Sequence, residues 1–137
     1  MTQSTKTVKG ISKGKRNGLS IQKLLMDELC VDVVTELRFA AELTGGTGKG
    51  LRERLRQAGV KDWRFDLAIP DHKIAIELEG GLFVNGRHGR GLGMISDMNK
   101  YNFGTLSGWR ILRFTHTHHK HAQIIDAVKI LITKFDN

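Results

Sequence analysis

The 137-residue sequence contains a single cysteine and a single proline, and aromatic residues make up only 7% of it. Because Cys30 has no partner in the chain, an internal disulfide is excluded, and we expect this side chain to be buried in a protein of the reducing cytoplasm. No apolar run approaches the ~18 residues of a membrane-spanning helix. The first 18 residues also lack the apolar core of a signal peptide, so we expect no membrane partner.

Acidic residues are scarce too, since 14 Asp and Glu stand against 22 Lys and Arg and leave a net charge of +8. Such an excess is typical of proteins that bind a polyanion, above all nucleic acid, although solubility alone is the other explanation. The first 24 residues contain no acid and six basic side chains: Lys6, Lys9, Lys13, Lys15, Arg16 and Lys23. We expect residues 1–19 to be a flexible basic arm that contacts phosphates through Lys13, Lys15 and Arg16, and residues 20–137 to be one domain.

Apolar residues recur at helical spacing over 20–43, with a break near 30–32, and again over 51–58, 95–107 and 122–135. Alternation of apolar and polar residues predicts strands over 63–69 and 73–79, and 109–114 is a third candidate strand. Six glycines in residues 80–94 indicate a loop. This order predicts an α/β domain with a central mixed β-sheet flanked by helices.

The hairpin predicted over 63–79 contains acids where a strand pair normally avoids them. If its turn spans 70–73, one face carries only apolar residues: Phe65, Leu67, Ile69, Ile74, Ile76 and Leu78. On the other face Asp66 lies opposite Glu77, and Glu79 follows two residues along, opposite Arg64. The β-carbons of directly paired residues are about 5 Å apart, and two carboxylates on such a pair share a proton or bind a cation. Three of them on one patch suit Mg²⁺, or Mn²⁺ in its place, and the alternative is an exposed face screened by Arg64 and Lys73.

Basic side chains follow this hairpin in the sequence. Arg87, His88 and Arg90 lie in the glycine-rich loop, and Lys100 lies on the next predicted helix. Hydrolysis of a phosphodiester needs an activated water and a positive charge that stabilises the transition state. Carboxylates followed by cations therefore favour a hydrolytic site for a nucleic acid.

The ordered segments 63–66 (WRFD), 75–81 (AIELEGG), 86–88 (GRH), Asp97, Lys100 and 108–115 (GWRILRFT) resemble the PD-(D/E)XK nuclease superfamily, in particular the branch similar to very-short-patch-repair endonucleases. The resemblance spans roughly residues 33–116. It implies a restriction-endonuclease-like core and a Mg²⁺-dependent endonuclease that acts on double-stranded or branched DNA, such as Holliday junctions. It also implies a homodimer, in the cytoplasm of a bacterial cell or a phage-infected host.

Position by position, the resemblance implies Asp66 and Glu77 as metal ligands. Glu36 would approach from the first helix as a further ligand or water-orienting group. Glu28 and Glu42 lie on the same predicted helix as alternatives to it.

The superfamily's lysine falls on Glu79, so this chain departs from the common pattern and needs its catalytic cation from elsewhere. Lys100 is the candidate substitute. Arg87 and His88 are the alternatives, and His88 has a side chain suited to general acid or base catalysis near neutral pH.

Two further stretches of the sequence resemble known binding motifs only weakly. The glycine-rich loop 45–50 lacks the spacing of a nucleotide-binding loop, but Lys49 and Arg52 beside it are candidate DNA contacts or part of a solvated helix. The histidine-rich stretch 116–121 matches no structural zinc pattern. The alternative functions are a catalytically inactive nucleic-acid-binding module of the same fold and an RNA-directed nuclease.

Overall fold

The computed structural model describes residues 13–80, 91–115 and 118–135. Its elements follow in the order α1 (Lys13–Leu29), β1 (Val34–Leu37), α2 (Phe39–Leu43), α3 (Leu51–Ala58), β2 (Phe65–Ile69), the 3-10 turn η2 (Pro70–His72), β3 (Ile74–Glu79), α4 (Leu92–Leu106), β4 (Arg110–Thr115) and α5 (His121–Phe135). The strands form one sheet in the order β1-β2-β3-β4, antiparallel except for the parallel β3–β4 pair. The predicted α/β class, a mixed sheet flanked by helices, is confirmed.

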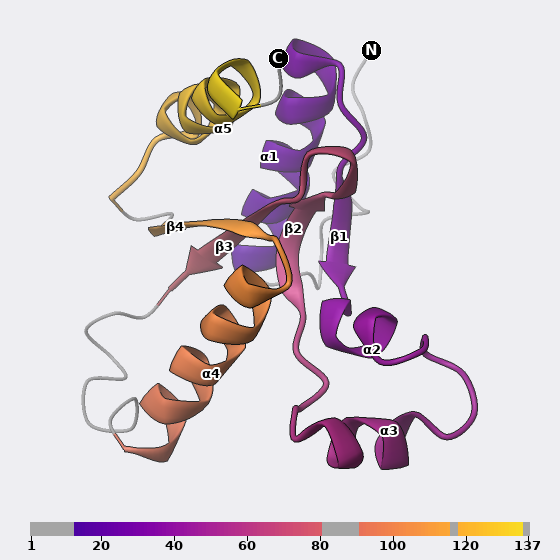
Figure 1. Cartoon of the computed structure of the whole chain (residues 1–137). Helices are drawn as coiled ribbons and strands as arrows, with labels where there is room; N and C mark the ends of the chain where they lie inside the picture. Colours follow the sequence, from indigo (N-terminus) through magenta and orange to yellow (C-terminus); the bar gives the residue numbers. More distant parts are fainter. Residues whose placement is uncertain (1–12, 81–90, 116–117, 136–137) are drawn as a thin grey trace.

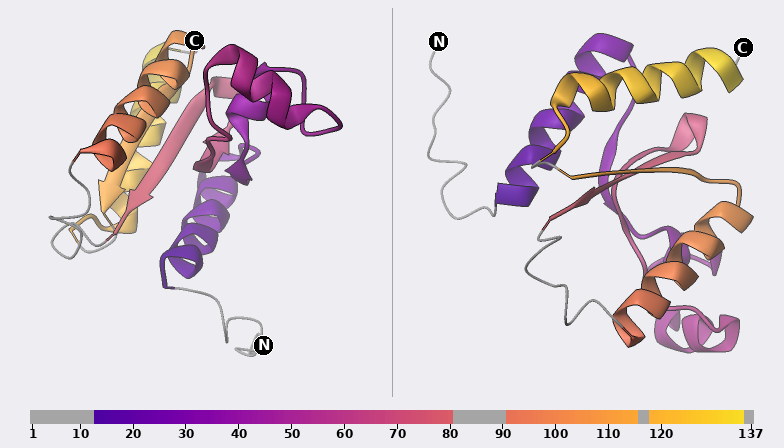
Figure 2. Two further views of the ribbon diagram at one scale, coloured as in Figure 1. Left: turned by 90° about the horizontal axis from the view of Figure 1, so that it is seen from below. Right: turned by 90° about the vertical axis from the view of Figure 1, so that its left-hand side faces the viewer.

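Helices cover both faces of the sheet (Figures 1 and 2). Helices α1 and α5 lie on one face and contact each other, while α4 and α2 lie on the other face. None of the helices in the described ranges is long and apolar enough to cross a membrane.

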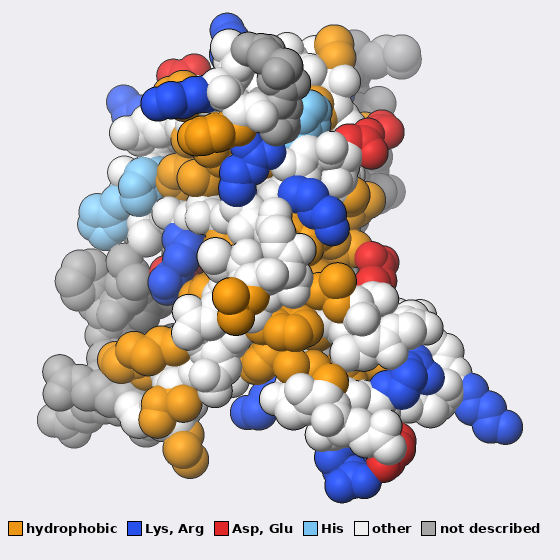
Figure 3. Space-filling model, in the orientation of Figure 1, with side chains coloured by type: hydrophobic (Ala, Val, Ile, Leu, Met, Phe, Trp, Pro, Cys, Tyr) orange, Lys and Arg blue, Asp and Glu red, His pale blue; other side chains and the backbone are white. Residues whose placement is uncertain are grey.

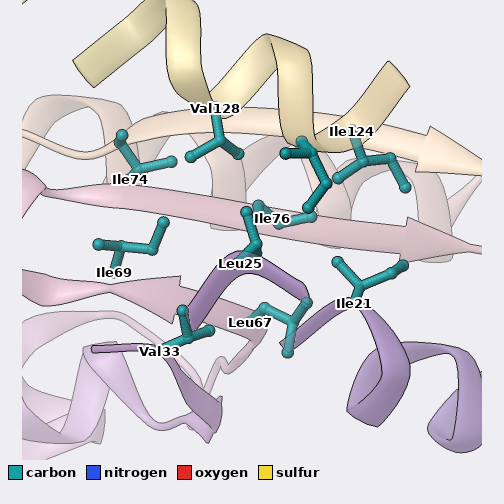
Figure 4. Close-up of a cluster of buried hydrophobic side chains, with 10 residues drawn as sticks. Ile21, Leu25, Val33, Leu67, Ile69, Ile74, Ile76, Ile124 and Val128 are labelled. Atoms are coloured by element: carbon teal, nitrogen blue, oxygen red, sulfur yellow. The ribbon is translucent and has the colours of Figure 1, made fainter. Parts of the chain in front are cut away.

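The larger core lies between the sheet and the α1–α5 face (Figure 4). Alternate residues of a strand project to the same side, so both hairpin strands direct branched apolar side chains towards these helices. The members of this core are Ile21, Leu25, Val33, Leu67, Ile69, Ile74, Ile76, Ile124, Ile125 and Val128. The predicted pairing of Ile69 with Ile74 and of Leu67 with Ile76 is confirmed.

A second, aromatic core lies on the other face. The rings of Phe39 and Phe65 stack with centres 3.8 Å apart, and Trp109 packs against Phe65. Ala68 and Ala75, two strand residues on this face, are small and leave room for the rings. The prediction that Phe65 shares the first face with Leu67 is therefore wrong. The regular pairing of β2 with β3 ends at Leu67, so the alternation of side chains does not continue to Phe65.

The helical prediction over 20–43, with its break near 30–32, is confirmed up to Leu29 and again over Phe39–Leu43, but it is wrong between them. The chain forms the edge strand β1, which pairs with β2, and then the short helix α2. Cys30 is exposed, contrary to expectation, and has a left-handed backbone with φ 53°. At the other end, α1 begins at Lys13, so residues 13–19 are helical rather than part of a flexible arm, and the rest of that arm lies outside the described residues.

Candidate active site

The hairpin changes its bonding pattern where the two acids lie. Beyond the paired residues Leu67 and Ile76, carboxylates take over from backbone carbonyls as acceptors. The backbone N–H of Asp66 donates to Glu77 Oε2 (3.0 Å), and the N–H of Leu78 donates to Asp66 Oδ2 (2.8 Å). Asp66 and Glu77 therefore lie side by side on adjoining strands, as the register predicts, and each binds the backbone of the other strand.

Glu77 is the buried acid of this pair, with only 3% of its surface exposed. Lys100 reaches it from α4, and Lys100 Nζ forms an ion pair with Glu77 Oε1. Burial raises the pKa of the Glu77 carboxyl to about 7, the charge of Lys100 opposes the rise, and the neighbouring Asp66 adds to it. Glu77 is thus a carboxyl group that changes its charge near neutral pH.

Glu79 faces a different set of partners. It accepts hydrogen bonds from Arg113 Nε (2.7 Å) and from the hydroxyl of Tyr101 (3.2 Å). The guanidinium of Arg113 also lies 4.3 Å from the centre of the Tyr101 ring. Glu79 therefore joins β4 to α4, two residues from Glu77, and its cationic partner is Arg113 rather than the predicted Arg64.

The predicted patch of three carboxylates does not form. Over the described parts of the chain, no three or more Asp, Glu, His or Cys side chains gather in a way that would hold a metal ion. Asp66 and Glu77 remain as a pair, and Asp66 Oδ1 has no hydrogen bond with a described residue. Since Mg²⁺ commonly uses one or two protein carboxylates and completes its shell with water and phosphate oxygens, this pair fits such an ion.

A cavity of about 300 Å³ adjoins Asp66 on the α1 side of the sheet. Its polar lining residues include Lys15 from α1, Glu36 from β1 and Asp66 itself. Glu36 was expected on a helix, and it instead reaches the cavity from the edge strand, where its φ of 53° is left-handed. A non-glycine residue in this region is strained, and such strain is common at functional sites.

The other predicted site residues are dispersed. Arg87, His88 and Arg90 lie outside the described residues, and Lys13 and Arg16 belong to α1. Lys49 precedes α3, and Arg52 lines a separate hollow beside Asp62.

Figure 3 shows Lys and Arg side chains over α3 at the lower right and apolar side chains over α4 at the lower left. The exposed apolar residues of α4 include Leu92, Met94, Ile95 and Met98. The basic surface of α3 and the exposed apolar surface of α4 are thus separate on this side of the molecule.

Sequence reasoning missed the role of Arg113 at this site. Arg113 reaches its partner Glu79 because β4 pairs in parallel with β3. In that pairing Arg113 lies opposite Glu77, two residues from Glu79. That pairing was not predicted, although the order strand, helix, strand over 74–115 is the signal for a parallel crossover.

Comparison of the chain with known protein families, with curated protein sequences and with solved structures finds no match.

Proposed function

We propose that the protein is a metal-dependent endodeoxyribonuclease that hydrolyses phosphodiester bonds. The observation that carries this proposal is the Asp66–Glu77 pair, with Lys100 from α4 against Glu77. Two carboxylates facing a phosphate would repel it, so the pair favours a role in holding a cation. The net charge of +8 on the whole chain supports a polyanionic substrate.

Each side chain has a task in this proposal. Asp66 and Glu77 would hold Mg²⁺ or Mn²⁺, which when bound supplies the chemistry of water activation and charge neutralisation. Lys100 supplies the positive charge that stabilises the phosphate in the transition state. Glu36, which lines the cavity together with Asp66, is the proposed water-orienting group or further ligand.

Lys100 takes the task that the resemblance assigns to a lysine at position 79. Glu79 is engaged by Arg113 and Tyr101, so it contributes to the placement of α4 rather than to the metal. Arg87 and His88 stay proposals that rest on the resemblance alone.

The test is cleavage of plasmid, single-stranded and four-way-junction DNA in Mg²⁺, in Mn²⁺ and in EDTA. We expect Asp66→Asn and Glu77→Gln to lower the cleavage rate by roughly 100-fold or more. The matched control is Asp71→Asn in the exposed hairpin turn, which should cleave like the wild type. Cleavage that survives in both site variants would sink the metal-site assignment.

The same assay separates the remaining alternatives. Tight DNA binding without cleavage of any substrate would establish a catalytically inactive binding module, and cleavage confined to RNA would establish an RNA-directed nuclease. Faster cleavage of the four-way junction than of plasmid would support selectivity for branched DNA. Sedimentation of the purified protein tests the homodimer that the resemblance implies.

A further inference from the structure

Four positions of helix α1 are spaced four, three and four residues apart and therefore lie on one face. Two of them, Ile21 and Leu25, are fully buried in the larger core. The other two are Gly18, which is buried, and Gly14, which is exposed, at the end of the helix that lines the cavity beside Asp66. A glycine inside a helix costs about 1 kcal/mol relative to alanine, so two glycines on this face call for an explanation.

Neither close packing nor backbone conformation requires these glycines. A Cβ on Gly14 would meet no atom within 4 Å, and a Cβ on Gly18 would lie at an ordinary 3.7 Å from Leu78 Cδ1. Both residues lie within the right-handed helix α1. The missing side chains leave space between this end of α1 and the sheet. Further along the same face, the side chains of Ile21 and Leu25 fill the corresponding space.

This space has three kinds of wall. Leu19, Leu67 and Leu78 provide apolar surface, and Lys15 provides a positive charge. Glu36 and Asp66 provide carboxylates, whose charge a bound cation has to offset before an anion can approach. A nucleotide complements these walls, since its sugar and base present apolar faces and its phosphate is an anion. The volume of about 300 Å³ is at the lower end of the range of about 300 to 1,000 Å³ for small-molecule sites, which suits one nucleotide and excludes a base-paired duplex.

We propose that the cavity is a substrate subsite that receives a single unpaired nucleotide of the DNA strand, next to the phosphate that is cleaved. This inference rests on the proposed nuclease function and adds to it the class of substrate. Asp66 belongs both to the carboxylate pair and to the cavity lining, so a nucleotide in the cavity adjoins the reacting phosphate. DNA with a splayed or unpaired strand can supply such a nucleotide directly. In an intact duplex the nucleotide must first be unpaired and unstacked, which costs free energy.

The test uses deoxyadenosine 5′-monophosphate as the probe, titrated into ¹⁵N-labelled full-length protein in Mg²⁺, which offsets the negative charge of Asp66. We expect amide shifts at Gly14, Gly18 and Thr35 in the wild type. Gly14→Leu fills the cavity and should weaken binding at least tenfold and raise the KM for cleavage by a similar factor, about 1.4 kcal/mol. Ser20→Leu is the matched control, because it adds the same side chain to an exposed position of α1 outside the cavity.

Gly14→Leu should melt at or above the temperature of the wild type, since leucine is the better helix former. If it fails to fold, Gly18→Ala replaces it, with an expected loss of about threefold because one methyl group fills part of the cavity. Shifts that map elsewhere, binding by Gly14→Leu equal to that of the wild type, or the same shifts with inorganic phosphate alone would each overturn the subsite.

The two proposals fail in different ways. If the wild type cleaves DNA and Gly14→Leu has the same KM and the same nucleotide affinity, the nuclease proposal stands and the subsite is wrong. If the wild type binds the nucleotide in the cavity but cleaves no nucleic acid, the nuclease proposal is wrong and the cavity is a nucleotide site.

Discussion

Glu77 is a carboxylate shielded from water and held between the ammonium group of Lys100 and the backbone N–H of Asp66. Removing a carboxylate from water costs free energy that a single ion pair repays only in part. At a structural position, an apolar residue of similar size would serve stability better. The acid is thus a cost to the fold that its proposed role in metal binding explains.

The raised pKa makes this cost depend on pH. The carboxyl of Glu77 titrates at about 7 in the folded protein and at its ordinary value of 4.5 when unfolded. Between these values the folded state binds more protons, so the stability of the wild type should fall, relative to Glu77→Gln, as pH rises from 4.5 to 7. We expect a change on the order of 3 kcal/mol, measured by urea unfolding of both proteins. A wild type that instead gains stability relative to Glu77→Gln as pH rises would mean that Lys100 outweighs burial and lowers the pKa of Glu77.

Lys100→Met should destabilise the protein more at pH 8 than at pH 5. Without Lys100 the pKa of Glu77 rises further, so at pH 8 the variant must either bury an unpaired charge or take up a proton, at a cost of about 3 kcal/mol. At pH 5 Glu77 is already protonated and the variant loses little. Lys61→Met is the control, because Lys61 is exposed and only reaches Ser96 at 3.5 Å. Equal losses at both pH values in urea unfolding would contradict the coupling between Lys100 and Glu77.

At the scale of elements, the position of Lys100 depends on how closely α4 approaches the sheet. Gly104 is the buried residue of α4, and a Cβ there would lie 2.9 Å from Ile111 Cδ1 and 3.1 Å from Phe65 Cζ. The Phe65 ring is stacked on Phe39 and has little freedom to move. The glycine therefore allows the helix to lie directly on the aromatic core.

Gly104→Ala should destabilise the protein by about 1–3 kcal/mol, even though alanine is the better helix former. The added methyl group must push α4 away from the sheet, which also moves Lys100 from Glu77 and should lower cleavage. Thr105→Ala is the control on the exposed side of the same helix and should be close to neutral. Thermal unfolding measures both variants, and equal stability of Gly104→Ala and the wild type would show that α4 has room to spare.

The elements also show how far the sequence predicts this fold. The hairpin register followed from alternation and the turn at Pro70, because branched residues recur with period two on both sides of it. Strand β1 was missed because Val33, Leu37 and Ala40 have helical spacing in the sequence. In the structure they lie in a loop, a strand and a short helix, respectively. The partnership of Glu79 with Arg113 was missed because it depends on the pairing of β3 with β4, which are distant in the sequence.

For the molecule as a whole, charge and site are arranged separately. The acids of the site are few and are neutralised locally by Lys100 and Arg113, while Lys15 lies on α1 and Arg52 on α3. A long polyanion can contact both helices at once, whereas a small anion can contact only one. If DNA is the substrate, each of these helices should supply its own phosphate contacts.

The dependence of DNA binding on salt tests this arrangement. Binding by the Asp66→Asn protein, which should not cleave, is measured from 50 to 300 mM salt with a fluorescent duplex. Each phosphate contact contributes about 0.9 to the slope of log K against log salt, so Lys15→Ala and Arg52→Ala should each reduce the slope by about that amount. Lys134→Ala, at the exposed end of α5, is the charge-matched control and should leave the slope unchanged. Equal slopes in all three variants would show that neither α1 nor α3 touches the DNA backbone, and the proposed path of the substrate across both helices would then be wrong.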